Sequence, residues 1–403
     1  MSKKHTRVPS IMYHSVGIPN DNWHWKYLTC PYEVFESQLK WLKLTGYTTL
    51  VFQDVYDYVM NDKPVPKKSV FLTFDDGYLD NYIYVYPLLK KYGMKGTIFV
   101  NPDFVEKSNG LRKTLDDYAS ADEIKKEETL GFCNWDELKK IDSEGIIDVQ
   151  SHAKTHAWYP ISDKIIDFRH PDDAYIWMDW NEFPDKKPYL QCIDKKIVKL
   201  GSAVFENEKA LSSKRVFINE DFQKKLQEYV DNNGGELFFN NPNWKIELEN
   251  MASNLKDQFQ IIDKSETDQD YFERIKFELE FTKNEIEKHL DKKVNFICWP
   301  GGSATKKGVL IAEELGYLMS TAARDIPELR KKIINSPDFK INRISRFVPV
   351  IYDNTWKKGI KSKIRYSPGW FFILQLMRFQ NRYFAGFWVK ALRYIIVRVK
   401  AYV

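Results

Sequence analysis

The 403-residue chain contains only four cysteines, has no C-x-x-C pair and has no run of 18 apolar residues. The cysteines are Cys30, Cys133, Cys192 and Cys298, and their scattered positions indicate neither a disulfide framework nor a cysteine zinc site. Without a long apolar run, no membrane-spanning helix is expected. The formal net charge of +5 is modest for this length, so the composition does not indicate nucleic-acid binding.

The N-terminal segment lacks the features of a secretion signal. Residues 1–7 are basic, but Ile11 and Met12 are followed almost at once by His14, so no apolar h-region is present. We therefore expect a cytoplasmic protein with reduced thiols.

Acidic residues are absent after Asp353, whereas five basic residues lie between positions 357 and 365. Residues 370–377 and 384–403 then mix aromatic and aliphatic side chains with further Lys and Arg. Helices of this composition lie in membrane interfaces beside anionic lipids. The alternative is a helical pair that docks on the rest of the protein. We expect peripheral contact of this tail with the inner face of the cell membrane.

Two adjacent carboxylates follow an apolar segment near residue 72. Residues 72–78 read Leu-Thr-Phe-Asp-Asp-Gly-Tyr, and with the two preceding residues they predict a buried parallel strand that ends at Asp75 and Asp76. Catalytic groups in β/α folds lie at this edge of the sheet. Asp-Asp-Gly is also an ordinary turn sequence, so the pair by itself does not define a site.

A pair of histidines strengthens the case for a site. Residues 151–156 read Ser-His-Ala-Lys-Thr-His and follow an expected strand at 146–150. His152 and His156 are four positions apart, so one helical turn would place both on the same face. Two imidazoles and one carboxylate make a catalytic zinc site with an open position, whereas solvated loop histidines are the alternative for the pair alone. Together with the two aspartates, the spacing favours a metal site.

These two motifs, in this order, resemble those of the NodB-homology polysaccharide deacetylases, carbohydrate esterase family 4. The similarity covers residues 9–156 and roughly 272–347, and within the family it is greatest to the branch that deacetylates poly-N-acetylglucosamine. The resemblance implies that Asp75 is the general base. It also implies that Asp76, His152 and His156 bind the metal. Zinc is the expected ion, and cobalt or nickel also suits these ligands.

Further site residues follow from the same resemblance. His14 corresponds to a general acid, with a core histidine bonded to the backbone as the alternative. Trp299, Pro300, Gly301 and Gly302 correspond to an aromatic-Pro-aromatic-Gly turn that helps to shape the acetyl pocket, with Gly301 in place of the second aromatic residue. Backbone N–H groups of such a turn can stabilise an oxyanion, although a plain strand-to-helix turn is the alternative. Tyr78 is assigned to the same substrate-binding or oxyanion group.

Two features of the more widespread branch of the family are missing. We find no Arg-Pro-Pro-Tyr type motif, whose Arg orients the catalytic Asp, so Arg343 in the expected last strand is the candidate replacement. That branch also has a late acid His, but no histidine follows His289 here. This absence favours His14 as the acid.

Strands and helices alternate on both sides of an aromatic-rich central segment. This order predicts an α/β protein with a distorted (β/α) barrel of the polysaccharide deacetylase type, an inserted subdomain and a helical basic C-terminal tail. We expect residues 1–156 and 270–353 to form the two parts of the barrel, 157–269 the insertion and 354–403 the tail.

The sequence therefore predicts a metal-dependent hydrolase that removes N-acetyl groups from an N-acetylated sugar. The expected substrate is a cell-surface polysaccharide or its lipid-linked precursor. One alternative is hydrolysis of a non-sugar amide by the same residues. Another is a non-catalytic glycan-binding or membrane-scaffold protein, against which the intact set of expected metal ligands argues.

Overall fold

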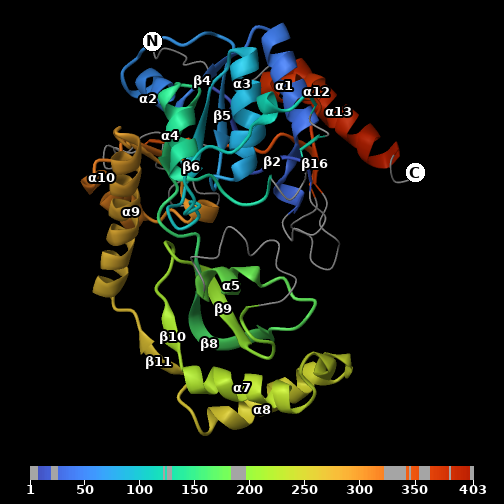
Figure 1. The fold of residues 1–403 in the computed structure, drawn as a ribbon, viewed down its shortest axis with the longest axis vertical. Coiled ribbons are helices and arrows are strands. Elements are labelled where there is room, and N and C mark those ends of the chain that lie inside the picture. The colour runs from blue at the N-terminus through green and yellow to red at the C-terminus, as the bar shows by residue number, and fades with distance from the viewer. Residues whose placement is uncertain are drawn as a thin grey trace.

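The computed structural model describes residues 8–19, 26–120, 123–124, 129–182, 197–321, 342–344, 346–353, 364–380 and 383–399. Within these ranges the chain forms a larger α/β lobe, a smaller lobe below it in the view of Figure 1, and a C-terminal pair of helices.

The larger lobe is built on a sheet of eight parallel strands. They are β1 (Ser10–Tyr13), β4 (Thr48–Leu50), β5 (Ser69–Phe74), β6 (Gly96–Val100), β7 (Ile147–Ser151), β12 (Phe296–Ile297), β13 (Met319–Thr321) and β14 (Asn342–Ile344). Their order is β1-β5-β6-β7-β12-β13-β14, and β4 pairs with the first half of β5. After β14, Phe347 forms a parallel bridge with Ile11 of β1, so the sheet returns to its first strand. The prediction of an α/β fold with a distorted barrel is confirmed.

The central strands explain why the site lies where it does. Every residue of β5 and of β6 is buried, as expected of parallel strands covered on both faces. Gly96 opens β6 beside the ring of Phe74, and a Cβ at this position would lie 2.9 Å from that ring. Asp75 directly follows β5 and Asn101 directly follows β6, so polar side chains gather at the C-terminal edge of these strands.

Helices cover the outside of the sheet (Figure 1). They are α1 (Tyr32–Leu44), α2 (Phe52–Met60), α3 (Tyr86–Tyr92), α4 (Trp135–Ser143), α9 (Asp268–Leu290) and α10 (Lys306–Glu314). Shorter elements are β2 (Val16–Gly17), η1 (Lys26–Leu28), β3 (Cys30–Pro31), η2 (Asn81–Val85), η3 (Leu115–Asp117) and η8 (Pro300–Gly302). Apolar residues at helical spacing face the sheet, for example Phe35, Leu39 and Leu42 of α1, which are all buried.

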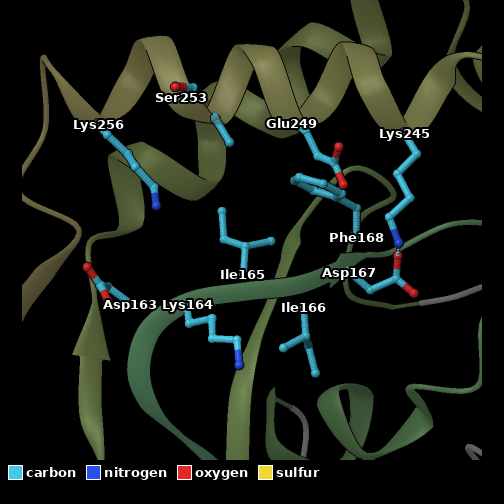
Figure 2. A pocket seen from close by; sticks show the side chains of 11 residues that line it. Asp163, Lys164, Ile165, Ile166, Asp167, Phe168, Lys245, Glu249, Ser253 and Lys256 are labelled. Carbon is cyan, nitrogen blue, oxygen red and sulfur yellow. Dashed lines mark hydrogen bonds and ion pairs between the residues drawn. The ribbon is translucent and has the colours of Figure 1, made fainter.

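The smaller lobe lies between β7 and α9 in the sequence. It contains β8 (Trp158–Phe168), α5 (Ile176–Glu182), β9 (Ala203–Lys209), β10 (Val216–Ile218), α7 (Glu220–Asn232), η7 (Gly235–Asn240), α8 (Trp244–Lys256) and β11 (Ile262–Ser265). β8 and β9 form an antiparallel pair, and Phe168, Phe205, Phe222 and Leu248 belong to a separate apolar core. A cleft of about 450 Å³ opens between β8 and α8 and contains the ion pair of Asp167 with Lys245, at 2.8 Å (Figure 2). None of the residues that line this cleft belongs to the predicted site.

The C-terminal region docks on the larger lobe. It contains β15 (Val350–Asp353), β16 (Ile364–Tyr366), α12 (Gly369–Phe379) and α13 (Tyr383–Val399). The Gln38 side chain of α1 donates a hydrogen bond to the Ser367 carbonyl at 2.6 Å, and a Cβ at Gly369 would lie 2.3 Å from the Ser37 carbonyl oxygen. The predicted tail, residues 354–403, is not helical throughout, because β16 pairs with β15 before the helices begin. Among the described residues, no helix combines the length and hydrophobicity that crossing a membrane requires.

One buried carboxyl group makes the stability of the larger lobe depend on pH. Asp80 is 7% exposed and accepts hydrogen bonds from the Ser15 hydroxyl and the Val16 backbone N–H. Burial raises the pKa of Asp80 to about 7, although these hydrogen bonds oppose the shift. The folded state then holds a proton that the unfolded chain releases near pH 4, so raising the pH between these two values lowers the free energy of unfolding.

We expect Asp80→Asn to flatten this pH dependence. In the wild type the group should lower the free energy of unfolding by roughly 3 to 4 kcal/mol between about pH 4 and about pH 7, with no further loss above that range. Chemical unfolding measured from about pH 5 to about pH 8 tests this. Asp172→Asn, at an exposed position, is the matched control and should keep the wild-type slope. An unchanged slope in Asp80→Asn would show that Asp80 does not cause it.

Candidate active site

The two aspartates lie in the turn that ends β5. Asp76 and Gly77 both have left-handed backbone angles, with φ of 74° and 76°. Glycine adopts this conformation without steric strain, whereas aspartate adopts it only with strain. Such backbone strain is typical of functional sites. Both carboxylates are buried, with Asp75 3% and Asp76 6% exposed. The turn therefore holds two acidic groups inside the protein at the C-terminal edge of the sheet.

The positive charge of Arg346 balances the negative charge of Asp75, the first of these carboxylates. Its Nη1 lies 2.6 Å from Asp75 Oδ1 and its Nη2 lies 2.9 Å from Asp75 Oδ2, a bidentate pair. Nη1 also donates to the Thr73 hydroxyl at 3.0 Å. Burial alone would raise the pKa of Asp75, but the charge and hydrogen bonds of Arg346 hold it below its ordinary value. Asp75 is therefore kept ionised and fixed in one orientation.

The prediction of Arg343 as the residue that orients Asp75 is corrected by this geometry. Arg346, three positions later and next to the bridging Phe347, makes the contact. The side chain of Arg343 lies outside the described part of the chain, and only its place in β14 is known. The sequence shows both arginines, but only the register of the last strand decides which one reaches Asp75.

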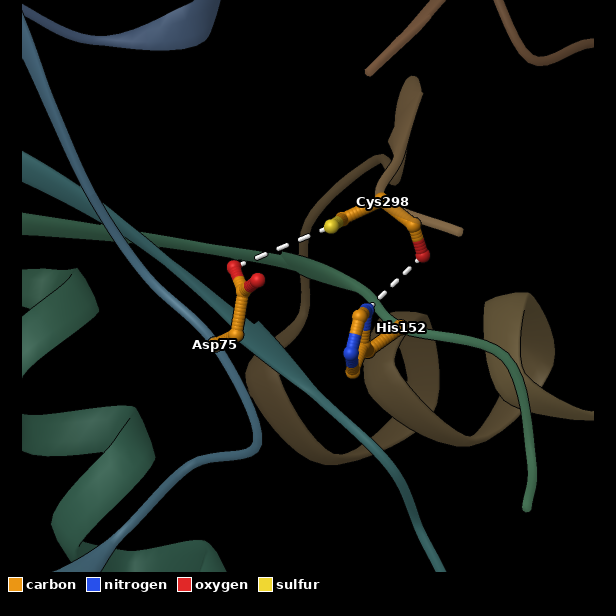
Figure 3. A group of neighbouring side chains, drawn as sticks. All are labelled: Asp75, His152 and Cys298. Carbon is orange, nitrogen blue, oxygen red and sulfur yellow. Dashed lines mark hydrogen bonds between the residues drawn. The ribbon is translucent and has the colours of Figure 1, made fainter. Parts of the chain in front are cut away.

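The two histidines lie on a loop after β7, not on a helical turn as predicted. Ala153 has a left-handed φ of 58°, which bends the chain directly after His152. His152 Nδ1 donates to the Cys298 carbonyl at 2.8 Å, and this leaves Nε2 facing Asp76 Oδ1 at 3.2 Å (Figure 3 shows the Cys298 contact). Burial lowers the pKa of the half-buried His156 to about 4, so its imidazole is neutral near pH 7. A neutral imidazole is the form that ligates metals.

Asn101, which the sequence analysis did not identify, holds this loop in place. The residue follows β6 and is fully buried. Its side-chain amide donates to the carbonyl oxygens of His152, at 2.5 Å, and Ala153, at 3.0 Å. Loop carbonyls in a dry interior need such donors, because an unpaired buried carbonyl costs free energy. A polar residue directly after a buried strand is the one signal that the sequence offers for this role.

The structure supports a metal ion at Asp76, His152 and His156 independently of their spacing in the sequence. One ligand atom from each residue lies within 4.8 Å of the others. Asp76 Oδ1 is buried and accepts no hydrogen bond within the described residues, although His152 Nε2 lies close to it. Burial would raise the pKa of Asp76, but His152, His156 and His14 hold it well below its ordinary value. An ionised oxygen without a hydrogen bond, next to imidazole nitrogens, is suited to a divalent cation.

Asp75, His152 and Cys298 form a second group of candidate ligands (Figure 3). Cys298 Sγ lies 3.7 Å from Asp75 Oδ1 and 2.9 Å from Arg346 Nη2. A cation placed among these three residues would be repelled by the Arg346 guanidinium. The group with Asp76 and both histidines is therefore the better metal site.

His14 lies across from the catalytic candidate Asp75. It follows the last residue of β1, and its Nε2 is 4.0 Å from Asp75 Oδ2. The side chain is 20% exposed, whereas that of Asp75 is 5% exposed. His14 is therefore at the same edge of the sheet but nearer to solvent, where it can meet a leaving group.

The turn formed by residues 299–302 offers fewer free backbone N–H groups than predicted. The Trp299 N–H donates to the Thr321 hydroxyl at 3.3 Å, and the Gly302 N–H donates to the Trp299 carbonyl at 2.9 Å. Pro300 has no N–H, so Gly301 is the only member of the turn whose N–H has no partner among the described residues. Gly301 lies under Lys209 of β9, since a Cβ at Gly301 would be 2.9 Å from Lys209 Cε. The smaller lobe thus reaches the predicted acetyl pocket.

Tyr78 lies in an aromatic cluster at the side of the site. Its ring stacks on Phe132 with centroids 4.9 Å apart, and Phe104 and Trp180 complete the cluster. Phe104 also stacks on the imidazole of His156, at 6.4 Å. Tyr78 is 3% exposed, so its side chain supports the histidine loop through this cluster.

Comparison with known proteins identifies the class of domain to which the site belongs. Residues 62–174, which include Asp75, Asp76, His152 and His156, match the family model for polysaccharide deacetylases. This part of the chain is a polysaccharide deacetylase domain, and the predicted family resemblance is confirmed.

Individual relatives match shorter parts of the chain. It is 43% identical over 99 residues to YxkH of Bacillus subtilis (strain 168), covering 25% of this chain and 33% of that protein. It is 32% identical over 130 residues to the poly-beta-1,6-N-acetyl-D-glucosamine N-deacetylase of Staphylococcus aureus (strain MRSA252), covering 32% of this chain and 37% of that protein. The chain thus spans about a third of the length of these curated relatives.

Solved structures match over a larger share of the chain. A de-N-acetylase from Aggregatibacter actinomycetemcomitans has a TM-score of 0.49 and 17% identity, covering 85% of this chain and 94% of that chain. The BpsB deacetylase domain from Bordetella bronchiseptica has a TM-score of 0.45 and 17% identity, covering 85% and 95%.

We expect Asn101→Leu to destabilise the protein by about 1 to 3 kcal/mol, because two buried loop carbonyls lose their donor. Urea unfolding measures the change. Asn233→Leu is the matched control, since the Asn233 amide also donates to a backbone carbonyl, at 2.7 Å, but at an exposed position. It should change stability by less than about 0.5 kcal/mol. Equal effects of the two substitutions would contradict a special role for Asn101.

Proposed function

We propose that the protein is a metal-dependent hydrolase that removes an acetyl group from the nitrogen of an N-acetylated sugar. The observation that carries the proposal is the arrangement of Asp75, paired with Arg346, beside the group formed by Asp76, His152 and His156. Members of the polysaccharide deacetylase family are hydrolases of N-acetyl amide bonds, which supports the reaction class. The reaction forms a bond between a water oxygen and the acetyl carbon, breaks the carbon–nitrogen bond, and releases acetate and an amine.

The cation site provides the electrophilic part of this chemistry. When bound, a divalent cation polarises the acetyl carbonyl and lowers the pKa of a water molecule. Asp76, His152 and His156 would hold it, with His152 oriented by its bond to the Cys298 carbonyl. Zinc suits two imidazoles and a carboxylate best, and cobalt and nickel suit the same donors.

The other residues move protons and stabilise charge. Asp75 accepts the proton of the attacking water, because Arg346 keeps it ionised and fixed. In this proposal the Gly301 N–H donates to the oxyanion that develops on the acetyl oxygen. His14 gives a proton to the leaving nitrogen, at the more exposed side of Asp75.

The substrate is proposed to be an N-acetylated glycan or its lipid-linked precursor. The S. aureus relative is named for poly-beta-1,6-N-acetyl-D-glucosamine, and this supports an N-acetylglucosamine polymer as the first substrate to test. Release of acetate from N-acetylglucosamine oligomers, lipid-linked N-acetyl sugars and N-acetyl-lysine peptides would separate a sugar deacetylase from a hydrolase of other amides. Release from the peptide alone would overturn the glycan proposal. The cytoplasmic location that the sequence suggests stays a prediction.

The cation site predicts the metal content of the purified protein. We expect one divalent ion per chain, lost in His152→Ala because one of three ligands is removed. His289→Ala is the matched control, since His289 lies on α9 and stacks on Trp135 away from the aspartates. Elemental analysis of the three proteins gives the answer. Equal metal content in the wild type and His152→Ala would rule out these ligands.

The ion pair predicts a shift in the pH dependence of the reaction. Arg346→Met removes the cation that lowers the pKa of Asp75, so burial raises it. Because the ionised form is the base, the acidic limb of kcat/KM should move to higher pH by about 1 to 3 units. Arg365→Met, an exposed position on β16, should leave the profile unchanged. A lower rate without a shifted limb would assign Arg346 a purely structural role.

Loss of the base itself gives a separate expectation. Asp75→Asn should lower kcat by about a hundredfold to ten-thousandfold, the range typical of a general base. Its metal content should stay at the wild-type level, because Asp75 is not among the proposed ligands. Near-normal turnover by Asp75→Asn would refute the assignment of the base.

A further inference from the structure

The charge of the chain is strongly divided along its length. The 50 residues after Asp353 contain 11 of the 61 basic residues and none of the 56 acidic ones. Residues 1–353 therefore carry a net charge of −6, although the whole chain carries +5. Such asymmetry indicates a segment that meets an anionic surface.

Helix α13 in this segment has two different faces. Its inner face is packed, because Ala385 and Val389 are 0% and 1% exposed, and Val389 contacts Ile351 and Phe371. The Arg393 side chain also bonds to the carbonyls of Val350 and Ile351. These contacts fix the helix on the larger lobe, so the orientation of its other face is determined.

The outer face of α13 presents aromatic rings. Phe387 is 68% exposed, Trp388 51% and Tyr394 57%. Phe387 and Tyr394 are seven positions apart, so they lie on one stripe of the helix, and the rings of Phe387 and Trp388 contact each other edge to face at 5.8 Å. Lys390, one turn after Phe387, is exposed and has no ion-pair partner within the described residues. In Figure 1 the helix extends outward from the larger lobe, at the upper right of the view.

We infer that this face of α13 binds the headgroup region of an anionic lipid bilayer. Tryptophan and tyrosine are the residues that prefer this region, and lysines and arginines beside them are attracted to acidic headgroups. Helix α13 carries Lys390 and Arg393 in its middle, so in this proposal it lies along the bilayer surface. A soluble polyanion without aromatic rings, such as inorganic polyphosphate, would use the positive charge but would leave the three exposed aromatic rings of this face without a role. The inference is independent of the proposed reaction.

Vesicle flotation of the full-length protein tests the inference. The probes are vesicles of phosphatidylcholine alone and of phosphatidylcholine with phosphatidylglycerol, at low and high salt. We expect binding to the anionic vesicles at low salt, weaker binding at high salt, and little binding to the neutral ones. The affinity of the double variant Phe387→Ser/Trp388→Ser for anionic vesicles should be lower by a factor of about ten or more. For Lys390→Glu the affinity should be lower by a factor of about five.

The control is Phe277→Ser on α9, which removes an aromatic ring of similar exposure, 55%, from a helix with many acidic residues. It should bind vesicles like the wild type. Circular dichroism and unchanged melting confirm that each variant is folded, since the replaced side chains are exposed. Equal binding of wild type and double variant, or equal binding to neutral and anionic vesicles, would overturn the inference. A double variant that only changes oligomeric state, measured by light scattering, would assign this face to a second copy of the chain instead.

Discussion

The ion pair between Asp75 and Arg346 is the contact on which the geometry of the site depends. It joins residues 271 positions apart, from the end of β5 and from the segment after β14. The next residue, Phe347, exchanges hydrogen bonds with β1 at 3.0 Å, so the same segment supplies the cation and returns the sheet to its first strand. Breaking a buried pair by removing one partner typically costs about 3 to 5 kcal/mol, because the remaining charge is left uncompensated. The neutralisation of Asp75 and the closure of the sheet therefore depend on the same segment of the chain.

The sequence predicts the parts of the site that are local, and it fails where contacts between distant segments decide. The strand before Asp75 and the spacing of the two histidines can be read from a few residues, and the fold class follows from alternating elements. The helical turn predicted for His152 and His156 is wrong, because Asn101 and the left-handed Ala153 hold an open loop. Arg346 was not distinguished from Arg343, since the choice depends on strand register. The sequence likewise does not predict that the Trp299 and Gly302 N–H groups are already hydrogen-bonded, because their partners are set by the folded structure.

The smaller lobe is linked to the site through its antiparallel strand pair, β8 and β9. β8 begins two residues after His156, and β9 ends at Lys209, whose side chain covers Gly301 and lies 5.7 Å from the Trp158 ring. This strand pair begins next to a proposed metal ligand and ends over the proposed oxyanion donor, so it constrains which substrates can enter between them. Gly301 tolerates this close approach because it has no side chain. Lys209 thus occupies the space beside Gly301 into which a side chain at that position would project.

The late position of Arg346 has a consequence for how the protein is made. A ribosome completes β5, β6 and β7 long before it reaches the segment after β14. Until then the buried Asp75 lacks its guanidinium, and β1 has an open edge where Phe347 will later pair. Unpaired strand edges promote association with other chains. Products truncated before residue 346 would keep this open edge, so we expect them to be aggregation-prone fragments and not weakly active versions of the complete protein.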